Sequence, residues 1–156
     1  MPAAFSNDIL TVHNALVTVC NAFTDPNGGS VTASRTMPDT GVTDAQLPYV
    51  WVRRGRQTGR NERASDLYDD TRQYQALVYV ARLNDGEMND EAAFDTALNW
   101  IKPFHKHLAQ SRVLTAPANL VVQAIRDSGD VSLHTKSGLR YAGVVFTIPV
   151  QSLTRF

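Results

Sequence analysis

The chain has 156 residues, 43% of them apolar and 19% charged, with 15 basic and 15 acidic side chains. This length fits a single domain over residues 1–156, and the composition excludes a disordered or fibrous protein. The formal net charge of zero excludes a bulk attraction to nucleic acid or to anionic membranes. An electrostatic partner must therefore meet a local patch of charge.

Cysteine content and hydropathy indicate the compartment. A single cysteine, Cys20, rules out an intramolecular disulfide and lies in an apolar pattern, which favours a core position in a reducing compartment. No apolar run approaches the roughly 20 residues of a membrane helix, and residues 1–8 lack the basic region of a signal peptide. We expect synthesis in the cytoplasm and no membrane partner.

The first predicted element is an amphipathic helix. Apolar residues recur from Phe5 to Phe23 at the three-to-four spacing of one helical face. Pro26 and the pair Gly28-Gly29 then stop both helix and strand. A polar loop at about 25–47 follows, and its unusual length indicates a contact arm that orders against a partner.

Two strands are predicted next, at Tyr49–Val52 and Tyr74–Leu83, joined by an arginine-rich loop at about 53–72. Apolar residues occupy both faces of the second strand, with Leu77 and Tyr79 opposite to Val78 and Val80. We therefore expect one face to pack on helices and the other to meet another subunit.

A second helix is predicted after a cap at Asn89 or Asp90. Pro103 lies inside its pattern and should kink or break the helix near Lys102, because proline lacks a backbone donor. The apolar stripe of this helix comprises Phe94, Ala97 or Leu98, Ile101, Phe104 and Leu108.

The C-terminal part reads as two more strands. One is predicted at Leu120–Ile125, although residues 120–126 also fit a short helix, and the last runs from Leu139 to Val150 after a turn at Ser137-Gly138. The resulting order is α-β-β-α-β-β. It predicts an α+β fold with a mainly antiparallel four-stranded sheet and two helices packed on one face.

Catalytic and metal-binding signatures do not emerge from the sequence. It contains no HExxH, CxxC, P-loop or GxSxG pattern. The spacing of two between His105 and His107 predicts an exposed pair at a helix end, and Asp69 and Asp70 would point to opposite faces of a strand. We expect a protein that is not an enzyme, with no catalytic residue, no metal and no cofactor.

Five arginines form the strongest local charge feature and are the candidate contact residues for a partner or a neighbouring subunit. Guanidinium groups bind carboxylates and phosphates through two parallel hydrogen bonds. A solvated loop neutralised by the acidic residues that follow is the alternative. Nucleic acid is less favoured, because aromatic residues for base stacking are missing within the basic half. The five are Arg53, Arg54, Arg56, Arg60 and Arg63.

The layout resembles the tail terminator, or tail completion, proteins of long-tailed bacteriophages, which belong to the head-tail junction. The resemblance covers most of the chain and lies in the arrangement of elements. The matching elements are the helix at Ser6–Phe23, the strand at Leu47–Val52 after a variable loop, the strand at Tyr74–Leu83, the helix from Asp90 and the closing strand at Leu139–Val150.

The resemblance implies a virion structural protein that caps the tail tube as a homohexameric ring and forms part of the neck. Its implied partners are further copies of itself, the tail tube protein, the head-tail connector or neck proteins, and transiently the genomic DNA. Such a protein is made in the host cytoplasm and ends in the virion. Two alternatives stay open: a neck or head-completion protein on the portal side, and a small nucleic-acid-binding module that uses the arginine-rich loop.

Overall fold

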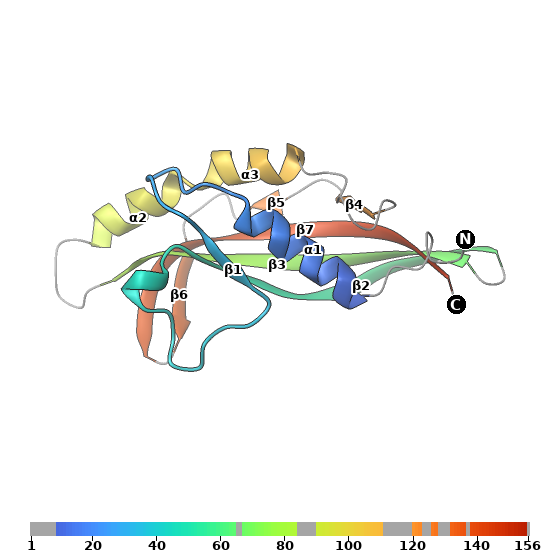
Figure 1. The fold of residues 1–156 in the computed structure, drawn as a ribbon, viewed down its shortest axis with the longest axis horizontal. Coiled ribbons are helices and arrows are strands. Elements are labelled where there is room, and N and C mark those ends of the chain that lie inside the picture. Colours follow the sequence, from blue (N-terminus) through green and yellow to red (C-terminus); the bar gives the residue numbers. More distant parts are fainter. Residues whose placement is uncertain are drawn as a thin grey trace.

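A computed structural model of the chain describes residues 9–64, 67–83, 90–110, 120–122, 126–127, 132–136 and 138–155. Within these residues the fold combines three helices with one sheet (Figure 1). The predicted α+β class is therefore confirmed.

The sheet is mixed, with the strand order β1-β2-β3-β7-β4 and with β5 and β6 also paired to β7. β1 runs parallel to β2, while every other described pair is antiparallel. The bounds are β1 Thr32–Ser34, β2 Tyr49–Ala64, β3 Leu67–Arg82, β4 Leu120–Val122, β5 Arg126–Asp127, β6 Ser132–Lys136 and β7 Leu139–Arg155.

Two parts of the fold prediction are thus wrong. The sheet has seven described strands where four were predicted in the order α-β-β-α-β-β. The prediction omits β1, whose three small or polar residues show no alternation that marks a strand, and the division of the C-terminal part into β4, β5 and β6. The described residues of the arginine-rich segment, 53–64 and 67–72, do not form a loop, since they belong to the paired strands β2 and β3. This polar segment lacks the apolar alternation that would predict a strand. Its strands are recognised only by the pairing of β3 with β2 on one side and β7 on the other.

Helices cover one face of the sheet. They are α1 Ile9–Asn21, α2 Asp90–Leu98 and α3 Ile101–Gln110. Figure 1 shows α2 and α3 along the upper side of the sheet. The predicted break near Pro103 is confirmed, because α2 ends at Leu98 and Pro103 lies in the first turn of α3, where its missing donor removes no helical bond.

The core between helices and sheet is rich in aromatic rings. The fully buried ring of Phe104 lies 4.8 Å from Phe146 of β7, 5.0 Å from Phe23 and 5.4 Å from Trp100, measured between centroids. Of the two residues predicted as alternatives in the stripe, Ala97 is buried and Leu98 is 48% exposed, and Trp100, which lies outside the predicted stripe, is buried as well. The break after Leu98 shifts the helical phase, which a continuous periodicity cannot reveal.

The other face of the sheet is partly covered by the chain itself. Tyr141 donates a hydrogen bond to the carbonyl oxygen of Val42 at 2.7 Å and accepts one from its N–H at 3.0 Å. Val42 and Met37 pack there with Tyr49 and Tyr79 in a second buried cluster. Apolar residues of segment 25–47 therefore pack on the molecule's own sheet.

Candidate interaction surface

Helix α1 closes one edge of the sheet with two polar side chains. The amide of Asn21 accepts from the N–H of Ala33 at 2.7 Å and donates to its carbonyl at 3.3 Å, so it pairs with the outer edge of β1. Two turns earlier on α1, the His13 ring bonds to the carbonyl oxygen of Val52. Together they occupy edge groups that would otherwise be open to another strand.

His13 is buried, with 6% of its surface exposed. A carbonyl oxygen can only accept, so the bond to Val52 requires the proton on Nε2. Burial lowers the pKa of His13; the bond to Val52 offsets part of this, and the charges of Arg35 and Arg54 add to the lowering. The ring is therefore neutral at pH 7.

A glycine marks the point where β2 leaves this shielded region. The pairing of β1 with β2 ends at Ser34 and Trp51, and a register irregularity follows between Arg53 and Arg56. A Cβ atom built on Gly55 would lie 2.5 Å from the ring of Tyr74, which real Cβ atoms do not tolerate. The bulge therefore needs glycine so that the buried Tyr74 ring can lie against the backbone.

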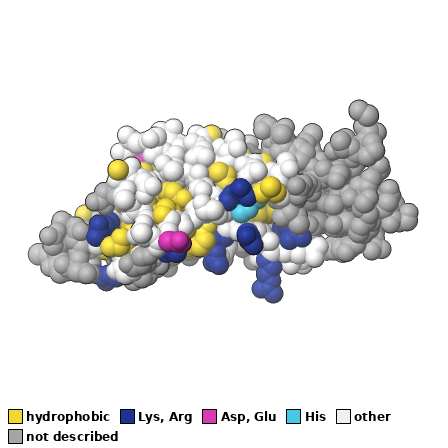
Figure 2. All heavy atoms as spheres, turned by 60° about the horizontal axis from the view of Figure 1, so that its bottom comes forward, with side chains coloured by type: hydrophobic (Ala, Val, Ile, Leu, Met, Phe, Trp, Pro, Cys, Tyr) yellow, Lys and Arg dark blue, Asp and Glu magenta, His cyan; other side chains and the backbone are white. Residues whose placement is uncertain are grey.

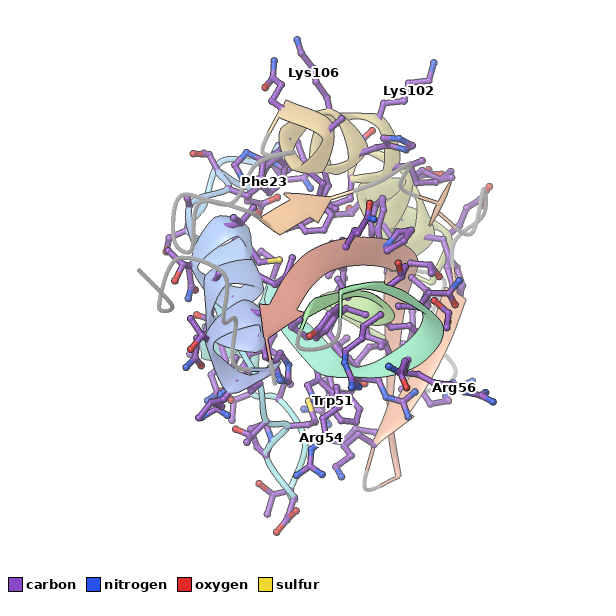
Figure 3. All side chains as sticks on the ribbon, turned by 90° about the vertical axis from the view of Figure 1, so that its right-hand side faces the viewer. Phe23, Trp51, Arg54, Arg56, Lys102 and Lys106 are labelled. Carbon is purple, nitrogen blue, oxygen red and sulfur yellow. The ribbon has the colours of Figure 1, made fainter. Side chains whose placement is uncertain are left out.

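Three arginines flank this glycine, and all three side chains are exposed: Arg53, Arg54 and Arg56. The guanidinium carbon of Arg53 lies 5.3 Å from the centroid of the Trp51 ring, and its Nη1 donates to Gln75 at 3.4 Å. Figure 3 shows Trp51, Arg54 and Arg56 on the side of the sheet opposite to Lys102 and Lys106 of α3. Arg53, Arg54 and Arg56, which we call the proximal arginines, thus lie on one side of the molecule.

The two distal arginines lie apart from these three. The register places Arg60 opposite Asp70 in β3, whereas Arg56 pairs with Gln73 and Arg53 with Gln75. Arg63 lies at an irregularity between Glu62 and Ala64, and the side chains of residues 59–70 lie outside the described part. Of the five predicted contact residues, the structure therefore groups only the proximal three.

Three neighbouring apolar side chains, which we call the apolar floor, lie next to the proximal arginines. Trp51, Leu77 and Val145 are direct neighbours across β2, β3 and β7, and all three are half-buried. Figure 2 looks toward this side and shows hydrophobic side chains among basic ones. We call the surface formed by Trp51, Leu77, Val145, Arg53, Arg54 and Arg56 the arginine face.

The grouping of Trp51, Leu77 and Val145 was not predicted from the sequence. The alternation placed Leu77 on the face opposite to Val78 but did not tell which face the helices cover, and it did not connect Leu77 with Trp51 or Val145. The signal was present as the period-two alternation of three separate strands. Only the pairing shows that the three residues are neighbours.

Reactive side chains elsewhere have structural roles. The predicted core position of Cys20 is confirmed, and burial raises the pKa of its thiol to about 12, so the thiol is not ionised near neutral pH. His107 is half-buried and bonds to the carbonyl oxygen of Val19 at 2.8 Å, which ties α3 to α1. The prediction of an exposed pair at 105 and 107 is therefore wrong, because His105 is half-buried as well.

Searches for other kinds of site were negative. Among the described residues no group of three or more His, Cys, Asp or Glu side chains is arranged to hold a metal. No helix in this part of the chain has the length and apolar character needed to cross a membrane. Comparisons with models of known protein families and with curated proteins found no match. Among the described residues, the arginine face is therefore the candidate functional surface.

Proposed function

We propose that this chain is a phage virion assembly protein that caps the tail tube as a ring and forms part of the head-tail junction. The observation that carries the proposal is the extension of β2, β3 and β7 past the helices (Figure 1), with exposed arginines beside half-buried apolar residues at the base of this extension. A subunit that must touch neighbours on several sides needs such an extended sheet. The resemblance to tail terminators in layout supports the same function.

The arginine face suits a protein partner better than a nucleic acid. The indole N–H of Trp51 donates to the carbonyl oxygen of Arg35 at 3.2 Å, and Arg53 lies over the Trp51 ring. The ring is thus half-buried and already stacked, so it offers little surface to a base. An apolar floor beside guanidinium groups matches the usual interior of a protein interface.

The test is the mass of the purified protein by light scattering over a concentration series, with negative-stain images of the same sample and sedimentation with purified tail tubes. The proposal predicts a closed ring of about six copies or capture on tube ends. Capture on DNA-filled heads without binding to tubes would replace the terminator with a neck protein. DNA binding that falls steeply with salt, without either capture, would replace it with the nucleic-acid module.

A further inference from the structure

Helix α2 presents a second exposed surface of opposite charge. Glu91, Asp95 and Leu98 are all exposed, and their spacing of four and three residues places them on one stripe of the helix. Leu98 is 48% exposed, which is high for a leucine next to the core residue Ala97. The stripe combines two carboxylates with one aliphatic side chain.

The two surfaces match in character. The arginine face offers guanidinium groups around an apolar floor, and the α2 stripe offers carboxylates beside an aliphatic side chain. They cannot meet within one molecule, because α2 lies on the helix-covered side of the sheet and the arginine face lies on the other (Figures 1 and 3). Two different surfaces of the same chain can pair only between copies, which gives a head-to-tail contact.

We infer that the arginine face of one copy docks on the α2 stripe of a second copy. Leu98 covers the floor of Trp51, Leu77 and Val145, while Arg54 and Arg56 bind the carboxylates of Glu91 and Asp95. This inference rests on the proposed ring, since a head-to-tail contact closes when the rotation between copies fits. It identifies the two surfaces that meet in that ring.

The test is a charge exchange measured by light scattering on the full chain. We expect Arg54→Glu/Arg56→Glu and Glu91→Lys/Asp95→Lys each to weaken self-association by about a hundredfold or more, because like charges facing across an interface cost several kcal/mol. The chain that carries all four changes should regain the association of the original protein. The matched control is Lys102→Glu/Lys106→Glu, which reverses two exposed charges on α3 and should associate normally.

Three outcomes would overturn the inference. Original protein that stays monomeric at every concentration excludes self-docking in solution, while tube capture still tests the proposed function separately. Association that survives both double reversals shows that a ring forms through other surfaces, which leaves the proposed function in place. Four changes that do not restore association, in chains whose circular dichroism is unaltered, show that the two surfaces are not partners.

Discussion

The first four residues of β2 and the rest of this strand both pair with β3, but they differ in what lies along their outer edge. In the first part, Tyr49–Val52, the helices cover one face, segment 35–47 lies on the other and leaves Trp51 half-buried, and α1 and β1 close the outer edge. In the second part, from Arg53 to Ala64, the pairing on the β1 side has ended. One strand thus combines a part that the rest of the fold covers with a part that has no β1 neighbour.

The largest effect is expected where the first part of β2 meets the helices. Phe104→Ala removes a fully buried ring that contacts Phe23, Trp100 and Phe146, so the free energy of unfolding should fall by about 3 to 5 kcal/mol. Urea unfolding followed by circular dichroism measures this. The exposed neighbour Lys106→Ala is the control, and an equal loss in both variants would contradict the core assignment.

Gly55→Ala tests the boundary between the two parts of β2. The added Cβ would lie 2.5 Å from the buried ring of Tyr74, and we expect a loss of about 2 to 3 kcal/mol through overpacking. Gly29→Ala is the matched control, because its Cβ would meet Asp25 at an ordinary 3.5 Å. Equal stability of the two variants in thermal unfolding would show that the bulge does not need glycine.

Tyr141→Phe tests the cover over the second face of the sheet. The change removes both hydrogen bonds to the buried backbone of Val42, which should cost about 1 to 2 kcal/mol. Segment 35–47 should then be cleaved faster in limited proteolysis. Unchanged cleavage would mean that the apolar contacts of Met37 and Leu47 hold this segment without the tyrosine.

The edge closure by His13 predicts a dependence of stability on pH. The folded pKa is lowered from 6.5, so the unfolded chain binds a proton first as the pH falls, and stability declines below about pH 6.5. Urea unfolding at pH 7.5 and pH 5.5 should show this decline. His13→Gln cannot titrate and should show a smaller decline; an unchanged decline would assign the effect to other groups.

The smallest effect on stability, and a large one on association, is expected for the triple variant Arg53→Ala/Arg54→Ala/Arg56→Ala. All three side chains are exposed, so the free energy of unfolding should change by no more than about 0.5 kcal/mol per site. Self-association in light scattering should weaken markedly. Unfolding of the triple variant would show that these arginines belong to the fold rather than to an interface.

Local patterns predicted the elements that repeat an apolar signal. The stripe of α1 at Val12, Leu16 and Cys20 is buried as expected, and the turn before β7 has its glycine, Gly138, at a φ of 78°. These features could be predicted because apolar periodicity and the backbone freedom of glycine depend only on residues close together in the chain.

Features that depend on contacts between residues far apart in the sequence were not predicted from it. The arginine-rich part of β2 has no strand signal of its own and is ordered by β3, which is paired in turn with β7. Segment 25–47 lies on the sheet through a contact between Val42 and Tyr141, which are 99 residues apart. The arginines were therefore singled out by residue type alone. Their grouping with the apolar floor depends on strand pairing, which residues adjacent in the sequence do not reveal.

The position of β7 in this sheet has a consequence for synthesis on the ribosome. β7 pairs with β3, β4, β5 and β6, yet it follows all of them along the chain. The aromatic core lacks Phe146 and the arginine face lacks Val145 until residues 139–155 have left the exit tunnel. The complete sheet must therefore wait until β7 has been synthesised, and β3 lacks one of its two neighbouring strands until then.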